Sequence, residues 1–112
     1  LRGWEMWIGD RRYIVALVRY TRTHRRTRLG ASPRAALGMM RAAKAAALLD
    51  GRSHVLPDDV RTLACPVLAH RIIVTAEAEL DGLSQESIVV EAIDEVRNHG
   101  VVAEAQEGTG AL

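Results

Sequence analysis

The sequence predicts an all-α protein, a small bundle of about four helices with one very short two-stranded β pairing. Its length of 112 residues suits a single domain. The hydrophobic content of 48% is sufficient for a core. Apolar residues recur at helical spacing along several stretches, which Gly and Pro residues separate.

The first predicted helix runs from residue 11 to about residue 24. Its apolar face has spacings of three and four and consists of Ile14, Leu17, Val18 and Thr21. The opposite face is basic and consists of Arg12, Arg19, Arg22 and Arg26. We expect the apolar face to enter the core and the basic face to be solvated. The segment 27–31, which contains Gly30, ends the pattern.

The second predicted helix, residues 33–49, has the strongest signals. Ser32 and Pro33 are typical of a helix start, because the Ser hydroxyl can accept a free backbone amide and Pro suits the first helical position. Most of the following residues are strong helix formers, with Gly38 as an interruption. Asp50 and Gly51 are expected to end the helix, since Gly readily adopts the left-handed conformation that follows many helices.

A third helix is predicted to begin at Pro57, with two Asp residues in its first turn. Leu56 then occupies the N-cap position, where its side chain cannot accept a backbone amide. Pro66 lies inside the same apolar stretch, so we expect either a kink or two short helices that meet near Cys65.

The last third of the chain predicts a short strand, a helix and a tail. The β-branched residues 72–74 indicate a very short strand, which we expect to pair with residues 54–56. A last amphipathic helix follows Ser84 and runs to about Arg97; the residues it is expected to bury are Ile88, Val89, Ala92, Ile93 and Val96. Residues 101–112 have no usable periodicity, which predicts a disordered tail.

Composition argues against several kinds of site and location. The single cysteine, Cys65, rules out an internal disulfide, and four dispersed histidines match no local zinc spacing, so no metal site is expected. No apolar run approaches the roughly 18 residues that span a bilayer, and no signal-type segment opens the chain. We therefore expect a cytoplasmic protein without a membrane partner. The chain does not begin with Met, which favours a piece of a longer protein.

Charge is distributed unevenly along the chain. Residues 1–44 carry eleven Arg or Lys and two acids, whereas residues 45–112 carry four basic residues and twelve acids. The basic half could bind phosphates or an acidic neighbour, or the two halves could neutralise each other in the fold.

The sequence lacks the residues that ATP hydrolysis requires. A glycine-rich loop that ends in Lys and Ser or Thr, followed by metal-holding acids, is absent. No arrangement of Ser, His and Asp, or of Cys and His, indicates a nucleophilic site. This chain alone is therefore not expected to be an enzyme or to bind a cofactor by itself.

Four segments together resemble the C-terminal lid of MoxR-type AAA+ ATPases, in the order and spacing of that family. The segment 29–36, LGASPRAA, resembles the sensor 2 segment that opens a lid helix. The others are YIVALVRYTRTH at 13–24, AAKAAALLDGRSHVLPDDV at 42–60 and PVLAHRI at 66–72. Together they cover most of residues 11–75. The resemblance implies an AAA+ lid over residues 11–100, with residues 1–10 as a linker from an ATPase core.

The resemblance also implies a site, a cofactor and partners. Arg34 is the expected sensor 2 arginine, whose guanidinium contacts the terminal phosphates of ATP, with Mg in the full-length protein. The expected partners are an N-terminal ATPase core, neighbouring protomers in a ring, commonly a hexamer, and a client protein. Nucleotide state would be coupled to ring assembly and to chaperone-like remodelling or metal insertion.

Three further positions are secondary candidates. Arg22, in a Thr-Arg pair that matches the family's pattern, and the pair His70 and Arg71 could brace the lid or reach an interface, or they could make buried hydrogen bonds. Leu56 departs from the family's usual Thr at the helix start. An ordinary exposed helix arginine is the alternative for Arg34.

Two other functions remain open at this level. A helical DNA-binding module would use the basic N-terminal half, although the alanine-rich second helix lacks base-reading Asn or Gln, and no nucleic-acid partner is expected. A helical protein-interaction domain with no nucleotide role is the other alternative.

Overall fold

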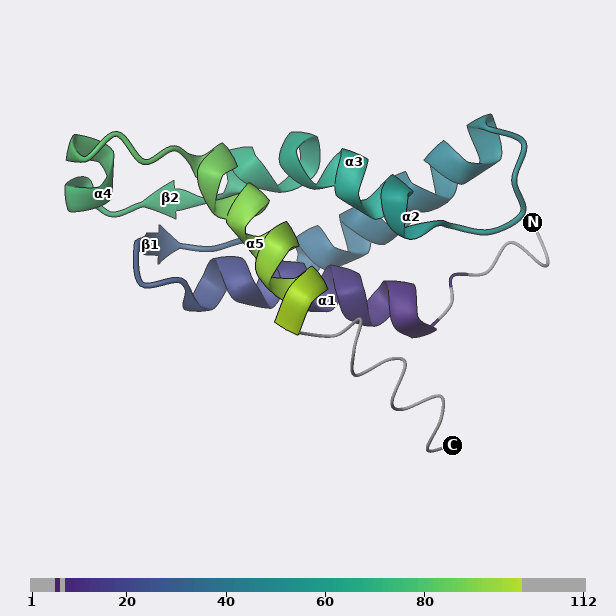
Figure 1. Cartoon of the computed structure of the whole chain (residues 1–112). Coiled ribbons are helices and arrows are strands. Elements are labelled where there is room, and N and C mark those ends of the chain that lie inside the picture. Colours follow the sequence, from purple (N-terminus) through teal and green to yellow (C-terminus); the bar gives the residue numbers. More distant parts are fainter. Residues whose placement is uncertain (1–5, 7, 100–112) are drawn as a thin grey trace.

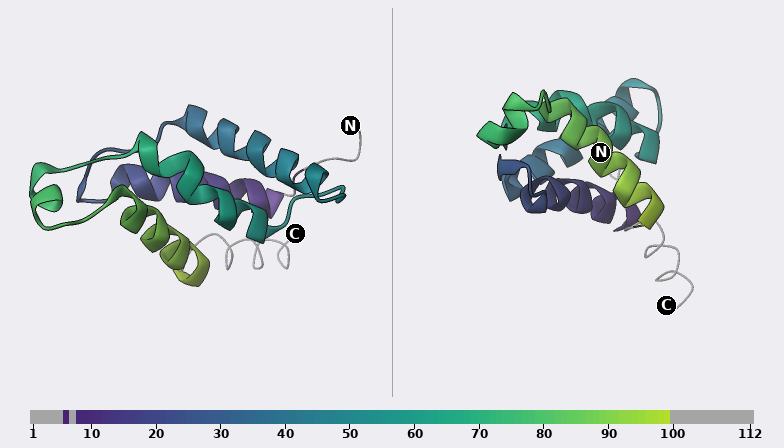
Figure 2. Two further views of the ribbon diagram at one scale, coloured as in Figure 1. Left: turned by 90° about the horizontal axis from the view of Figure 1, so that it is seen from above. Right: turned by 60° about the vertical axis from the view of Figure 1, so that its left-hand side comes forward.

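Four helices, α1, α2, α3 and α5, pack around a common core, and a small β pairing with a short helix extends from one end (Figures 1 and 2). The computed structural model describes residue 6 and residues 8–99. The elements in chain order are α1 (Ile8–Thr23), β1 (Thr27–Leu29), α2 (Pro33–Leu49), α3 (Pro57–Leu68), the 3₁₀ turn η1 (Ala69–Arg71), β2 (Ile73–Val74), α4 (Ala76–Leu80) and α5 (Gln85–His99). The predicted all-α class is confirmed. The expected disordered tail, residues 101–112, lies outside the described residues.

The core forms where the predicted apolar faces meet. In α1 the face with Ile14, Leu17, Val18 and Thr21 is buried, as expected from its spacing. From α5 the buried residues are Ile88, Val89, Ala92 and Val96, and Ile93 packs at the edge of the core. Helix α1 begins at Ile8, three residues earlier than predicted. In the described part of the chain, no helix is long and apolar enough to cross a membrane.

Helix α2 packs against α1 and α3 and buries mostly small side chains. Its buried residues are Ala35, Ala36, Met39, Ala43 and Ala47. Alanine adds little width to a helix, so the neighbouring helices can approach closely. The helix contacts α3 and α1 most extensively. The alanine-rich stretch therefore lets α2 pack closely on both α1 and α3.

Both ends of α2 fall where the sequence places them, but one cap differs. At the end, Gly51 has a φ of 74°, its amide donates to the Leu48 carbonyl, and the Arg52 amide donates to the Ala47 carbonyl. These two bonds form a Schellman motif. At the start, the Ser32 side chain makes no capping hydrogen bond, so that expectation was wrong. The Ala35 amide donates to the Ser32 backbone carbonyl instead.

Helix α3 runs through Pro66 as one element, so the expected pair of short helices was wrong. Proline removes only the hydrogen bond that residue 66 would donate to the Thr62 carbonyl. Thr62 and Pro66 are both exposed. Because this side of the helix faces solvent, water can satisfy the carbonyl that proline leaves free.

The short strand at residues 73–74 exists, but its predicted partner was wrong. Strand β2 pairs antiparallel with β1, at Thr27↔Val74 and Leu29↔Ile73, rather than with residues 54–56. The amide of Thr75 extends the pairing by donating to the Arg26 carbonyl. Helix α4, which was not predicted, follows directly and is capped by the Thr75 hydroxyl, which accepts from the Ala78 amide at 3.1 Å.

Candidate functional site

Arg34 lies in the first turn of α2 and is exposed to solvent. Within the described part of the chain, its guanidinium makes no hydrogen bond or ion pair. The first turn contains no acidic residue, so the positive end of the helix dipole is not neutralised by a side chain of that turn. An exposed cation at such a position can bind an anion together with the helix terminus.

The segment before α2 is held against the end of α1. Thr21 is fully buried; its hydroxyl donates to the Val18 carbonyl at 2.7 Å and accepts from the Ala31 amide at 3.1 Å. Gly30 packs directly on the α1 backbone, since a Cβ at this position would lie 2.5 Å from the Cα of Arg22. The start of α2 is therefore fixed by contacts to the last turn of α1.

The structure does not join the secondary candidates to Arg34. Arg22 is exposed in the last turn of α1, and no hydrogen bond or ion pair links it to Arg34. His70 and Arg71 are both exposed in η1, so the alternative of buried hydrogen-bonding roles for them was wrong. Their exposure is compatible with an interface role.

Sequence reasoning missed Arg52, which organises the connection between α2 and α3. Its guanidinium donates two hydrogen bonds of 2.7 Å to the carboxylate of Asp59, one of 2.9 Å to Asp50 and one of 3.2 Å to the His54 carbonyl. Asp59 also accepts from the Leu56 amide at 2.8 Å. The hydrogen bonds from Arg52 hold the pKa of Asp59 below its usual value. The Gly-Arg sequence after α2 was the available signal, but it did not reveal the partner.

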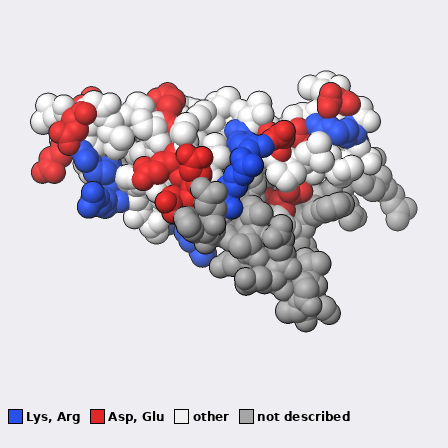
Figure 3. All heavy atoms as spheres, viewed as in Figure 1, with Lys and Arg blue, Asp and Glu red and all other residues white. Residues whose placement is uncertain are grey.

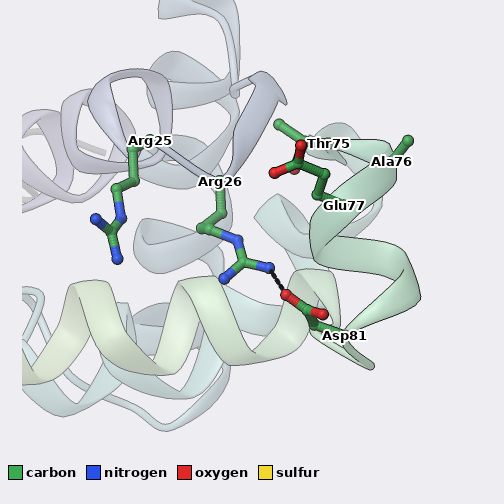
Figure 4. A pocket seen from close by; sticks show the side chains of 6 residues that line it. All are labelled: Arg25, Arg26, Thr75, Ala76, Glu77 and Asp81. Atoms are coloured by element: carbon green, nitrogen blue, oxygen red, sulfur yellow. Dashed lines mark hydrogen bonds and ion pairs between the residues drawn. The ribbon is translucent and has the colours of Figure 1, made fainter.

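A second polar cluster lies at the end of the molecule that carries β1, β2 and α4, where basic and acidic side chains are adjacent (Figure 3). Arg26 reaches across an open hollow to form an ion pair with Asp81 (Figure 4). Arg25 lines the same hollow, but its side chain does not point towards Asp81. His24 accepts from the Arg26 amide through Nδ1, and its Nε2 lies 3.0 Å from a Glu91 carboxylate oxygen. These contacts tie the turn after α1 to α4 and α5.

The titratable groups near this cluster and in the core are shifted mainly by burial. Burial and a hydrogen bond to Glu91 raise the pKa of Tyr20 to about 12. Burial raises the pKa of the half-buried Cys65 thiol, with a smaller contribution from Glu86. A raised thiol pKa favours a packing role over a reactive one. Among the residues that the structure describes, no group of three His, Cys, Asp or Glu side chains could hold a metal ion.

Comparisons with known proteins also indicate the lid of a MoxR-type AAA+ ATPase. A sequence model of the AAA lid domain family matches residues 19–92. The chain is 44% identical to the uncharacterised protein YeaC of Bacillus subtilis over 85 residues, which are 76% of this chain and 27% of that protein. It is 40% identical to the chaperone MoxR1 of Mycobacterium tuberculosis over 79 residues, which are 70% of this chain and 21% of that protein.

A solved structure has the same fold. The crystal structure of a candidate ATPase from Cytophaga hutchinsonii superimposes with a TM-score of 0.74 and 34% identity, and the match covers 81% of this chain and 30% of that one. The chain thus spans about a quarter of the length of the relatives that it matches. It belongs to the AAA lid domain family, and its resemblance to the lid of MoxR-type AAA+ ATPases is confirmed.

Proposed function

We propose that this domain senses bound ATP in a MoxR-type AAA+ ATPase, with Arg34 as the sensor 2 residue that contacts the terminal phosphates. The observation that carries the proposal is an exposed arginine in the first turn of a 17-residue helix, with no ion-pair partner among the residues that the structure describes. Arg34 also stands at the position that matches the sensor 2 segment of the family.

The unfavourable interaction of Arg34 with its own helix dipole supports a role in binding an anion from outside the domain. A cation in the first turn opposes the helix dipole, so its position costs a few tenths of a kcal/mol when no anion is present. Its exposed side chain contributes little to packing. A phosphate group would interact favourably with both the guanidinium and the positive end of the helix dipole, which reverses this cost.

The wider function follows from the longer proteins that share this lid. We propose that the lid acts beside an ATPase core that binds ATP and Mg, within a ring of protomers, commonly six, in the cytoplasm. The ring would use nucleotide state to drive chaperone-like remodelling or metal insertion into a client protein. The match to a protein named as a chaperone supports the first of these activities.

The test is ATP turnover by the complete ATPase with Arg34→Ala. Loss of a charge-assisted hydrogen bond to phosphate costs about 1.5 to 3 kcal/mol, which predicts roughly a 10- to 150-fold lower turnover if the contact is made fully in the transition state. Arg12→Ala is the control, because Arg12 is also exposed but lies near the start of α1, away from the α1 end that holds the α2 start. Wild-type turnover in a folded Arg34→Ala assembly would refute the assignment.

A further inference from the structure

The Thr21 hydroxyl makes a connection between α1 and the segment that precedes α2. It lies on the apolar face of α1 and is completely buried, as is Ala31. By donating to the Val18 carbonyl, the hydroxyl directs its lone pairs away from its own helix and towards the Ala31 amide. Without this acceptor, a buried amide would lose its partner, which is costly in a protein core.

Gly30 allows the segment before α2 to lie directly against the backbone of α1, beside the hydrogen bond from Ala31 to Thr21. The nearest atoms to a Cβ at this position would be the Cα and N of Arg22 and the carbonyl carbon of Thr21, at 2.5 to 2.7 Å. These are backbone atoms of a helix, which cannot move aside as a flexible side chain can. The segment 30–31 therefore rests on the last turn of α1 through one hydrogen bond and one backbone contact.

This connection lies only three residues before Arg34. Ala31 is followed by the N-cap Ser32 and by Pro33, whose ring fixes its φ angle. The Ser32 side chain makes no capping bond, so it does not hold the start of the helix itself. The position of the first turn of α2 therefore depends on its contacts to α1 through Thr21 and Gly30, in addition to the burial of Ala35 in the core.

We infer that Thr21 is a positioning residue for Arg34, so that its hydroxyl contributes to ATP recognition without touching the nucleotide. The inference rests on the proposed role of Arg34. A shift of about 1 Å in a binding group can cost up to roughly 100-fold in rate, so a small displacement of the α2 start is enough to weaken a phosphate contact.

The test compares ATP affinity in the complete ATPase, measured with a fluorescent ATP analogue, for Thr21→Val, Thr21→Ser and their combinations with Arg34→Ala. Valine keeps the shape of threonine and removes the hydroxyl, whereas serine keeps the hydroxyl. We expect Thr21→Val to weaken ATP binding by about 5- to 10-fold and Thr21→Ser to stay within about twofold of wild type. In the Arg34→Ala background, Thr21→Val should cause no further loss, because the residue that it positions is absent.

Val89→Ala is the control for general destabilisation. Val89 is fully buried in α5, which lies outside the contact between α1 and α2. This variant should lower the melting temperature and leave ATP affinity within about twofold of wild type.

The outcomes separate this inference from the proposed function. If Arg34→Ala does not weaken ATP binding, the sensor assignment fails. If Arg34→Ala weakens binding but Thr21→Val does not, or if the two losses multiply, only the positioning role fails. If Thr21→Val does not fold, Gly30→Ala displaces the same segment and leaves the hydroxyl in place. Its loss of affinity should also disappear in the Arg34→Ala background, and a loss that persists there would overturn the inference.

Discussion

Asp59 concentrates three hydrogen bonds in the connection between α2 and α3. Its carboxylate accepts two from Arg52 and one from the Leu56 amide, and its side chain is only 11% exposed. The bidentate geometry with Arg52 is the strong form of such a pair, and it links the segment that follows α2 to the first turn of α3. Asp59 therefore contributes more to stability than an isolated surface carboxylate would.

We expect Asp59→Asn to destabilise the domain by about 1 to 2 kcal/mol, because it removes the charge and one acceptor oxygen from this network. The pKa of Asp59 is lowered in the fold, so its contribution is fully present above the ordinary value of 3.8 and is lost as the pH falls through the lower folded pKa. Urea unfolding at pH 7 and at pH 3 measures both effects. The difference between wild type and variant should shrink at the lower pH. Asp58→Asn is the control, because the ion pair of Asp58 with Arg61 is exposed to solvent and contributes little to stability. An equal difference at both pH values would contradict the charge-based explanation.

Leu56 is a second position where one side chain alters a helix end. It is the N-cap of α3, is 38% exposed and offers no oxygen to the amides of the first turn. Leu56→Thr should stabilise the domain by about 1 kcal/mol, because a hydroxyl at this position would complete a capping box with Asp59. Thermal unfolding measures the change, and Leu49→Thr, at an exposed residue without a cap role, should bring no gain. A lower melting temperature for Leu56→Thr would show that burial of Leu56 outweighs its cap position.

At the level of helices and strands, the sequence predicted where helices begin and end better than it predicted which strands pair. Pro33 and Gly51 act within one or two turns of their own positions, so α2 could be delimited from the sequence. The partner of residues 73–74 could not, because strand pairing depends on which distant segment the packed helices bring nearby. Helix α4 has only five residues, too few for a helical period to be visible.

The candidate site follows the same division. Arg34 is a candidate because of its motif and its place at a helix start, and both of these signals are local. Thr21 was correctly placed on the buried face of α1, but spacing cannot show that its hydroxyl bonds to an amide ten residues away. The Arg52 network was missed because an arginine after a helix is usually solvated, and its carboxylate partner lies in the next helix.

Gly38 has the lowest helix propensity of the residues in the interior of α2, and the space around it does not require a glycine. It is exposed, and a Cβ there would meet nothing within 4 Å. Gly38→Ala should therefore stabilise the domain by about 0.5 to 1 kcal/mol, since alanine has less backbone freedom to lose on folding. Chemical denaturation measures the gain, and Gly51→Ala should act in the opposite direction because Gly51 has a φ of 74°. A loss of stability for Gly38→Ala would show that the glycine serves the fold in another way.

Across the whole molecule, the uneven charge of the sequence is partly neutralised by folding. Arg26 of the basic half pairs with Asp81 of the acidic half, and His24 contacts Glu91. These contacts join the first helix and its following turn to the last two helices. The basic half is thus used in part to hold the domain together, which weakens the case for a broad cationic surface that binds nucleic acid.

The same packing predicts how the isolated chain behaves. We expect residues 1–112 alone to fold, to give a mainly helical circular dichroism spectrum and to show no ATP turnover. The buried faces of α1, α2, α3 and α5 supply a continuous core, so folding does not require a partner. Hydrolysis requires a phosphate-binding loop and metal-holding acids, and the sequence contains no such loop. Arg34 and one helix terminus supply at most weak phosphate binding, so weak nucleotide binding would agree with this expectation. Protein-dependent release of phosphate from ATP by the purified, folded domain would contradict it and would require a catalytic site within these helices.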